Sequence, residues 1–302
     1  MYDVIIIGAG PGGMSASLYT SRSGLKTLLL EKEWITGGQM NSTEMVDNYL
    51  GSATEDAFEL AEKMYNQIKD DVDLKMGNNI VDVVYNDKNK TFSVLNSDGE
   101  EYISKVVIVA TGTKHKSLPV LDNYNGISYC AVCDFPFYED KDVAVIGGGD
   151  SALESALLLS EKSKKVYLIH RREKYRAKPH LIKAVKNKDN ISELLDCTVV
   201  GGLANDNNNI ETLFVDNMFL SEIIDLNVKG VFPEIGSIPN SNFLSSELVE
   251  KNSNGEIVAS KNEQLFIVGD VTDTKHKQIA IAVADGAKAG LDAYGAITRL
   301  KN

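Results

Sequence analysis

Short apolar runs alternate along the chain with segments whose apolar residues recur at helical spacing. Residues 4–7 form an uninterrupted apolar run, which is typical of a strand buried on both faces of a sheet. A glycine-rich turn and a helical pattern follow it. The same succession returns at residues 142–152, which is 139 residues after its first copy at residues 3–13. Two strand–turn–helix units half a chain apart predict an α/β protein with two nucleotide-binding domains.

The remaining patterns predict the outer elements of such domains. A capping-box pair, Ser52 and Glu55, precedes an apolar helical face between residues 57 and 68, and a last helix is expected over residues 278–297. The expected strands and turns are a hairpin of residues 80–85 and 91–95, a buried strand at 106–109 and a polar turn at 205–209. The apolar stripe on the last helix consists of Ile279, Val283, Ala287, Leu291 and Tyr294.

Two segments are the expected crossings between the domains, residues 113–119 and residues 236–240. Because the second glycine motif lies between them, we expect the chain to leave the first domain, build the second and return. The predicted fold is α/β with two Rossmann-like, three-layer domains, the second inserted into the first. We place the first domain at residues 1–113 and 244–302 and the second at residues 114–243.

Charge and cysteine content narrow the function. The chain has 302 residues, with 31 Lys and Arg against 43 Asp and Glu, for a formal net charge of −12. Such an acidic surface repels phosphate backbones and argues against nucleic-acid binding. The 3 cysteines are too few for a disulfide framework and fit a reducing compartment. No apolar run approaches the roughly 20 residues of a membrane span, and the first residues show no leader pattern, so we expect a cytoplasmic protein without membrane association.

The first glycine motif is Gly8-x-Gly10-x-x-Gly13, with Glu31 closing the apolar strand that follows its helix. Glycines at this spacing let the backbone turn tightly and approach a pyrophosphate at the positive end of a helix. A carboxylate at the end of the second strand suits a ribose 2′-hydroxyl. The alternative is a glycine-rich turn without a ligand, and the strand, helix and acid around the motif favour a dinucleotide.

The second glycine motif, GGGDSA at residues 147–152, differs from the first at its ribose end. Where the first copy has Glu31, the second has the basic segment HRREKYR at residues 170–176. Residues 162–178 hold eight Lys or Arg against one acid. Cations at this position suit a 2′-phosphate, which favours NADPH over NADH. A solvated charged face without a ligand is the alternative.

A third motif is Cys130-x-x-Cys133-Asp134. Two thiols separated by two residues can close a small disulfide, and the arrangement lowers a thiol pKa. Half of a zinc site is one alternative, but the chain offers no further ligands at paired spacing. Two inert core cysteines are another, although the neighbouring carboxylate would be costly to bury unpaired. The pattern favours a redox-active pair and no metal site.

With these motifs together, the chain resembles the low-molecular-weight thioredoxin reductases over essentially its whole length. The matching segments follow one another in the family's order and spacing, so they are more specific than any single motif. They are GAGPGG (8–13), GGQM (37–40), DNYLG (47–51), ATG (110–112), CAVCD (130–134), GGGDSA (147–152), HRREKYR (170–176), GVFPEIGSIPN (230–240), GDV (269–271) and KQI (277–279).

The resemblance implies an FAD domain split around an inserted NADPH domain, one FAD per chain and a homodimer. It places at the flavin cofactor Gly8, Gly10, Pro11, Gly13, Glu31, Gly38, Gln39, Asn48, Ala110, Thr111, Gly112, Gly269, Asp270, Lys277, Gln278 and Ile279. It places at NADPH Gly147, Gly149, Asp150, Ser151, Ala152, His170, Arg171, Arg172 and Arg176.

The same resemblance implies a reaction. Electrons pass from NADPH to FAD, then to the Cys130–Cys133 disulfide, and then to the disulfide of thioredoxin. In that scheme Cys133 faces the flavin, Cys130 attacks thioredoxin and Asp134 carries the proton. The inserted domain is expected to rotate, so that the nicotinamide and the disulfide take turns at the flavin.

Related redox functions are the competing interpretations. One is a reductase of another redox partner, a glutaredoxin- or peroxiredoxin-type protein. The peroxiredoxin-reducing class normally carries a thioredoxin-like extension before the first strand, which we do not expect here. A ferredoxin-driven thioredoxin reductase lacks the second glycine motif and the basic segment. An NADPH-responsive flavoprotein sensor needs no exchange dithiol.

Three residues depart from the family pattern: Phe135 replaces a Gly and precedes Pro136, Lys277 replaces an Arg, and Leu50 replaces a Pro. If the replaced Gly had a positive φ, Phe would not tolerate it. We therefore expect Phe135 and Pro136 to change the loop after the cysteines, and with it the face offered to the partner protein.

Overall fold

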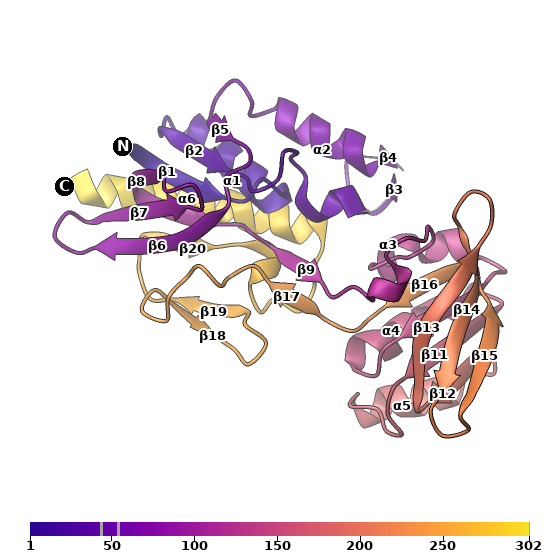
Figure 1. The fold of residues 1–302 in the computed structure, drawn as a ribbon. Helices are drawn as coiled ribbons and strands as arrows, with labels where there is room; N and C mark the ends of the chain where they lie inside the picture. The colour runs from indigo at the N-terminus through magenta and orange to yellow at the C-terminus, as the bar shows by residue number, and fades with distance from the viewer. Residues whose placement is uncertain (43–44, 53–54, 302) are drawn as a thin grey trace. The chain divides into compact units, whose positions relative to one another are not determined.

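The computed structural model describes residues 1–42, 45–52 and 55–301, and the chain divides into two compact units (Figure 1). The first unit is Met1–Lys114 with Ile238–Asn302, and the second is His115–Ser237. The two changes of unit lie one and six residues from the predicted boundaries, and both fall within the segments expected as crossings. These segments form strands β9 (Thr113–His115) and β17 (Ser237–Pro239), which pair with each other.

The second crossing comes earlier than the domain boundary at residue 244 that we drew from the sequence. Asn240 already belongs to the first unit, because its backbone N–H donates to the carbonyl oxygen of Gly112 at 3.0 Å. Its side chain also donates to the carbonyl oxygen of Thr111 at 2.8 Å. The sequence around Asn240 gives no sign of these contacts, because they join it to residues that lie far away in the chain.

The first unit is built on a seven-stranded sheet in the order β5-β2-β1-β8-β7-β6, with β20 also paired to β8. Strands β5, β2, β1, β8 and β20 run parallel, and the expected hairpin adds β7 and β6 antiparallel at one edge. The bounds are β1 (Tyr2–Ile7), β2 (Thr27–Leu30), β5 (Asp73–Lys75), β6 (Ile80–Asn86), β7 (Thr91–Asn96), β8 (Glu101–Val109) and β20 (Leu265–Ile267). Two small pairs complete it, β3 (Met45–Val46) with β4 (Glu55–Asp56) and β18 (Val249–Lys251) with β19 (Ile257–Ser260).

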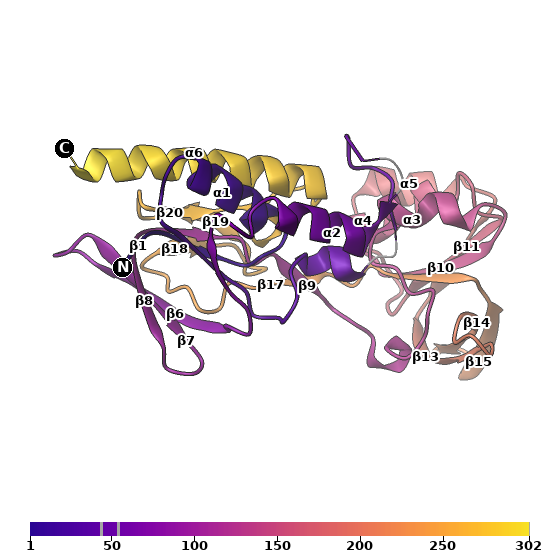
Figure 2. The same cartoon turned by 90° about the horizontal axis from the view of Figure 1, so that it is seen from above.

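Both faces of this sheet are covered, as the uninterrupted apolar runs predict. On β1, Ile5 and Ile7 point into one buried cluster while Val4 and Ile6 point into another. Helices α1 (Pro11–Arg22) and α6 (Ile279–Lys301) lie side by side on the second face (Figures 1 and 2). Their backbones approach closely, since a Cβ on Gly286 of α6 would lie 2.1 Å from the carbonyl oxygen of Gly12.

The apolar stripe that the sequence indicates on α6 is not the face that packs over its whole length. Most buried residues in the second half of the helix are small, such as Ala289, Ala293 and Ala296, and Ile297 is buried with them. Leu291 and Tyr294 of the stripe are 55% and 50% exposed. Small residues permit the close approach of α1, and this leaves Leu291 and Tyr294 on the outside.

Helix α2 (Ala57–Asn66) begins later than the capping-box prediction requires, so that prediction is wrong. Ser52 does hydrogen-bond to the carboxylate of Glu55, but Glu55 lies in a strand before the helix. The N-cap is Asp56, whose Oδ1 accepts the backbone N–H groups of Phe58 and Glu59 at 2.9 and 3.1 Å. An aspartate at this position accepts two backbone N–H groups of the first turn, which a Ser–Glu pair lying before the helix cannot reach.

The second unit repeats the strand–turn–helix design on a four-stranded parallel sheet in the order β12-β11-β10-β16. Helices α4 and α5 cover one face, and an antiparallel sheet of β13, β14 and β15 covers the other (Figure 1). The bounds are β10 (Asp142–Ile146), α4 (Asp150–Leu159), β11 (Lys165–His170), α5 (Pro179–Lys186), β12 (Ile191–Leu195), β13 (Cys197–Ala204), β14 (Ile210–Asn217), β15 (Glu222–Asn227) and β16 (Gly230–Pro233).

The two units therefore share the α/β, three-layer plan that the internal repeat predicts. Val143 and Val145 of β10 enter the cluster under the helices, and Ala144 and Ile146 enter the cluster under the antiparallel sheet. Within the described ranges, no helix has both the length and the apolar content needed to cross a membrane.

Candidate active site

The first glycine turn joins β1 to α1, and each of its three glycines is required for a different reason. Gly8 has a φ of +103°, and a Cβ there would lie 2.5 Å from the carbonyl oxygen of Ala110. A Cβ on Gly13 would lie 1.8 Å from the carbonyl oxygen of Gly8. By contrast, a Cβ on Gly10 would be 4.0 Å from the nearest backbone, such as the Cα of Gly38. Gly10 therefore keeps space open before the helix N-terminus, as pyrophosphate binding requires.

Glu31 follows β2 and its carboxylate is fixed beside this turn. Its Oε2 accepts the backbone N–H of Ala9 at 2.6 Å, and its Oε1 accepts that of Glu33 at 2.9 Å. Each carboxylate oxygen can accept a further hydrogen bond. The buried, anchored carboxylate is thus suited to receive ribose hydroxyls.

Gln39 and Asp270 come from distant parts of the chain and meet in the same region. The Nε2 of Gln39 donates to Oγ1 of Thr113 at 3.0 Å and to Oδ2 of Asp270 at 3.3 Å. Burial raises the pKa of Asp270, although the nearby Lys277 ammonium opposes this. Thr113, which sequence analysis did not select, is a member of this group.

Lys277 holds the loop that carries Asp270. Its Nζ donates to the carbonyl oxygen of Asp270 at 2.7 Å and pairs with Oε1 of Glu256 at 3.0 Å. Burial opposes ionisation of Glu256, but hydrogen bonds from Asn252 and Lys277 keep its pKa below the usual value. The lysine that replaces the family's arginine therefore has a defined structural role.

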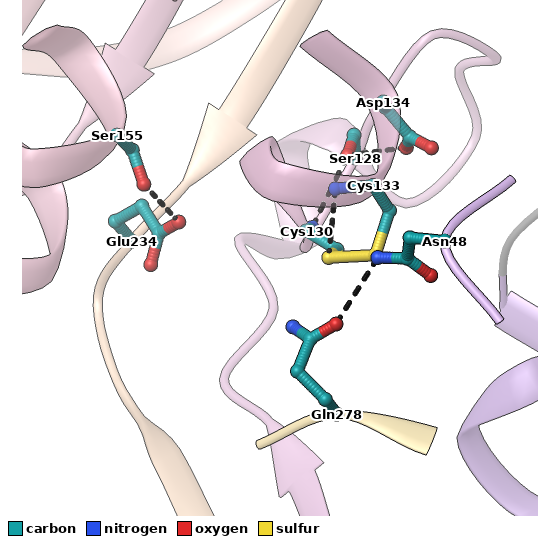
Figure 3. The surroundings of a disulfide bond; sticks show 8 residues. All are labelled: Asn48, Ser128, Cys130, Cys133, Asp134, Ser155, Glu234 and Gln278. Carbon is teal, nitrogen blue, oxygen red and sulfur yellow. Dashed lines mark hydrogen bonds between the residues drawn. A yellow bond between two sulfur atoms is a disulfide. The ribbon is translucent and has the colours of Figure 1, made fainter. Parts of the chain in front are cut away.

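A second pair of predicted residues is joined directly, since Nδ2 of Asn48 donates to Oε1 of Gln278 at 3.1 Å (Figure 3). Gln278 immediately precedes α6. Thr111 is joined to Asn240, to whose carbonyl oxygen its hydroxyl donates at 2.6 Å. Sequence analysis quoted Asn240 within a motif without giving it a role.

The other predicted residues of this set lie at the ends of the same elements, and they are Pro11, Gly38, Ala110, Gly112, Gly269 and Ile279. The open space at Gly10 and the acceptors of Glu31 fit a dinucleotide. The first unit therefore carries residues that could hold FAD.

The second glycine turn joins β10 to α4 and has the same construction. A Cβ on Gly147 would lie 2.4 Å from the carbonyl oxygen of Glu234 and 2.7 Å from the Cβ of Ala152. A Cβ on Gly149 would meet no atom within 4 Å among the described residues. The turn is thus tight at Gly147 and open at Gly149, which fits the pyrophosphate of a second dinucleotide.

Asp150 and Ser151 lie in the first turn of α4. Asp150 links that turn to Lys178, which follows the basic segment by two residues. Its Oδ1 accepts the backbone N–H of Lys178 at 2.9 Å, and its carboxylate pairs with Nζ of Lys178 at 3.0 Å. Hydrogen bonds from Lys178 lower the pKa of Asp150. Ser151 is exposed.

His170 is not the cation that the sequence comparison with Glu31 indicates. It is 6% exposed, and a Cβ on Gly148 would lie 2.2 Å from its ring. The ring stacks on Tyr175 with 5.4 Å between centroids, and its Nε2 lies 3.1 Å from the carbonyl oxygen of Lys174. Burial lowers the pKa of His170 below its usual value, so the ring is neutral at pH 7.

The positive charge of this segment belongs to the exposed Lys174 and to three exposed arginines, Arg171, Arg172 and Arg176. Across the described part of the chain, no ion pair joins any of them to an acid. Guanidinium groups at the end of β11 and close to the second glycine turn suit a 2′-phosphate.

Cys130 and Cys133 form a disulfide across one turn of the short helix α3 (Ala131–Asp134). Their Cα atoms are 5.3 Å apart, and the Sγ of Cys130 accepts the backbone N–H of Cys133 at 3.2 Å. Both cysteines are partly exposed. Among the described residues, no three or more His, Cys, Asp or Glu side chains come together in a group able to hold a metal.

Ser128 is a further member of this site that sequence analysis missed (Figure 3). Its hydroxyl donates to Oδ2 of Asp134 at 2.6 Å and accepts the backbone N–H of Cys130 at 3.2 Å. A serine two residues before a cysteine belongs to no motif, so only the folded loop reveals it.

The backbone at Phe135, which replaces the family's glycine, is not strained. Its φ is −55° and its ψ is −30°, which any residue adopts. The ring packs against the core of the second unit, and Nζ of Lys162 lies 5.8 Å from its centroid. The exposed apolar side chains around the disulfide are instead Val132 and Phe137.

Glu234 lies at the end of β16, where Oγ of Ser155 donates to its Oε1 at 2.8 Å (Figure 3). Burial raises the pKa of Glu234, and the neighbouring Glu154 raises it further. A carboxyl whose pKa is raised by folding favours the folded state when protonated. It loses that contribution as pH rises from the usual value of 4.5 through the raised value.

Glu234→Gln is therefore expected to raise the melting temperature at pH 8 by about 2–4 °C, which corresponds to roughly 1 kcal/mol. At pH 4 the gain should vanish, because the glutamate is then neutral too. Thermal unfolding between pH 4 and pH 8 measures the change in melting temperature. Glu139→Gln is the control, because Glu139 is exposed. A gain that is the same at both pH values would contradict the assignment.

Comparison with known proteins agrees with this geometry. Residues 2–286 match the family model described as pyridine nucleotide-disulphide oxidoreductase. A thioredoxin reductase of Ureaplasma parvum is 34% identical over 313 residues, covering 99% of this chain and 98% of that protein. One from Bacillus subtilis is 35% identical over 303 residues, covering 96% and 92%.

A solved structure gives the same result. The crystal structure of thioredoxin reductase from Streptococcus pyogenes superposes with a TM-score of 0.91 at 34% identity, and the match covers 99% of each chain.

Proposed function

Because the chain belongs to the pyridine nucleotide-disulphide oxidoreductases and, within them, to the low-molecular-weight thioredoxin reductases, we propose that it reduces the disulfide of thioredoxin with electrons from NADPH. The observation that carries the proposal is the partly exposed Cys130–Cys133 disulfide, in the unit that also holds a nucleotide turn and its arginines. NADPH-dependent reduction of thioredoxin disulfide by the purified protein tests it.

FAD is the group that the first unit would hold, with Gly10 at its pyrophosphate and Glu31 at its ribose. When bound, it accepts a hydride from a nicotinamide and passes an electron pair to a disulfide. Gln39, Asn48 and Asp270 are the remaining polar groups that we assign to it. The pairs Gln39–Asp270 and Asn48–Gln278 support this, because they bring side chains from two distant segments together.

The dithiol performs the exchange. Two electrons and two protons, supplied by NADPH and a proton from solvent, convert the Cys130–Cys133 disulfide to two thiols. The thiolate of Cys130 then attacks one sulfur of thioredoxin, and the displaced thioredoxin sulfur takes a proton. Cys133 attacks Sγ of Cys130, which restores the disulfide and releases the second thioredoxin thiol. Asp134 is the group that we assign to proton transfer in these steps.

Arg171, Arg172 and Arg176 are assigned to the 2′-phosphate of NADPH. Replacing Arg171 and Arg172 with alanine is expected to raise the KM for NADPH at least about 10- to 100-fold, because even one charge-assisted hydrogen bond contributes about 1.5–3 kcal/mol. The KM for NADH should change little. Steady-state kinetics with both donors measure this.

Lys188→Ala is the matched control for that test, because Lys188 lies in the same unit and pairs with Glu161 at a site remote in sequence from the glycine turn. Equal losses with NADPH and NADH in the arginine variant would contradict the 2′-phosphate assignment.

A homodimer is also part of the proposal. The exposed Leu291 and Tyr294 on α6 and Tyr19 on α1 give the first unit an apolar outer surface, which suits a subunit contact. We further propose a cytoplasmic location, because a reactive dithiol of this kind works against a reducing background.

A further inference from the structure

Ser128 connects the two chemical groups of the disulfide site. It is 6% exposed, and its backbone N–H donates to the carbonyl oxygen of Val231 on β16 at 2.9 Å. The residue is therefore fixed to the central sheet of the second unit. From this fixed point its hydroxyl reaches Asp134 on one side and the backbone of Cys130 on the other (Figure 3).

The directions of these hydrogen bonds follow from which groups can donate. A hydroxyl has one proton to donate, and the backbone N–H of Cys130 can only donate to its oxygen. The proton of Ser128 is thus available for Oδ2 of Asp134, which must accept it. The separation of 2.6 Å is short for a hydrogen bond between two oxygens, so the contact is a strong one. The Ser128 hydroxyl therefore fixes the position of the Asp134 carboxyl group.

We propose that Ser128 is a positioning residue for thiol–disulfide exchange, which holds the carboxyl group of Asp134 against the helix that carries the two cysteines. The inference rests on the proposed function, in which Asp134 transfers the proton. Without this hydroxyl the carboxylate loses a donor that favours its charged form. It also loses the link to the start of α3, so its position relative to the sulfurs is less well defined.

Other titratable groups surround the site and stay unchanged in the tests below. Helix α4 packs against α3 and carries Asp150 and Glu154, and the turn directly after α3 carries Tyr138. Tyr129 lies between Ser128 and Cys130, and burial raises its pKa. These groups set a common background, so a change in the pH profile between variants reports the Ser128–Asp134 contact.

Ser128→Ala in the flavin-loaded protein tests the inference, with Ser128→Thr as the variant that keeps the hydroxyl. The NADPH-reduced proteins are mixed, between pH 5.5 and pH 9, with oxidised thioredoxin or with the small disulfide cystamine. We expect Ser128→Ala to slow flavin reoxidation about 10-fold or more, and to move the acidic limb of the pH profile to higher pH. Ser128→Thr should recover most of the rate and the original profile.

Ser160→Ala is the matched control. Ser160 is a buried serine of the same unit, 7% exposed, and its hydroxyl donates to the carbonyl oxygen of Leu157 rather than to the disulfide site. It should leave the pH profile unchanged. The rate of flavin reduction by NADPH and the melting temperature of each variant separate a local effect from misfolding.

A second arm uses Asp134→Asn. If Ser128 acts through Asp134, then Ser128→Ala should cause no further slowing of reoxidation when it is added to Asp134→Asn. Additive losses, or a Ser128→Ala profile that matches the wild-type profile, would overturn the inference. A wild-type protein that reacts with cystamine but not with thioredoxin would refute the proposed partner, and the comparison of the Ser128 variants would still decide the inference.

Discussion

Cys130→Ser is expected to abolish the reduction of thioredoxin disulfide, with a loss of at least about 1,000-fold. A serine hydroxyl forms no thiolate near neutral pH, so it can neither attack a disulfide nor close one with Cys133. Reduction of the flavin by NADPH should persist, because the glycine turns and the arginines are untouched. Stopped-flow absorbance of the flavin after adding NADPH, and again after adding thioredoxin, measures both steps.

Cys197→Ser is the matched control for this variant. Cys197 is buried in the second unit at the start of β13, and its Sγ donates to the carbonyl oxygen of Leu195 at 3.1 Å. A serine can make the same hydrogen bond, so turnover should stay close to that of the wild-type protein. Turnover by Cys130→Ser, or its loss in Cys197→Ser, would contradict the assignment of the exchange pair.

Gly13→Ala is expected to destabilise the first unit and to abolish flavin binding. Its Cβ would lie 1.8 Å from the carbonyl oxygen of Gly8, a distance that only a shift of α1 away from β1 can relieve. Overpacking at a buried site costs about 1–3 kcal/mol or more, so the melting temperature should fall by about 5 °C or more. Thermal unfolding and the flavin absorbance of the purified protein measure the two effects.

Gly10→Ala separates folding from cofactor binding at the same turn. A Cβ on Gly10 would have 4.0 Å of clearance from the protein, so the fold should tolerate it. The methyl group would nevertheless enter the space assigned to the FAD pyrophosphate. We expect a melting temperature of the flavin-free protein within about 1–2 °C of wild type, together with a greatly reduced flavin content. Normal flavin content in Gly10→Ala would show that the pyrophosphate lies elsewhere.

The local sequence pattern is sufficient to predict the fold, because the same strand–turn–helix pattern occurs twice in the chain. An uninterrupted apolar run followed by closely spaced glycines admits few structures, and β1 and β10 are buried on both faces as that pattern predicts. The comparisons confirm both the family and the α/β fold that the motifs indicated.

Features that depend on contacts between distant segments were the ones missed. Asn240 and Thr113 enter the first site only because two crossings return to it, and Ser128 meets Asp134 only through a folded loop. The sequence groups His170 with the basic residues that follow it. Its burial against Tyr175 depends on packing, which the sequence does not reveal. The exposed face of α6 was likewise set by the glycines of α1, which lie far away in the sequence.

An anaerobic titration of the flavin-loaded protein with NADPH, and separately with NADH, tests the central claim most directly. Flavin absorbance is followed, and oxidised thioredoxin is then added. The account predicts that NADPH bleaches the flavin at a much lower concentration than NADH does, and that thioredoxin restores the absorbance. A flavin that neither nicotinamide bleaches, or that thioredoxin fails to reoxidise after NADPH has reduced it, would contradict the account.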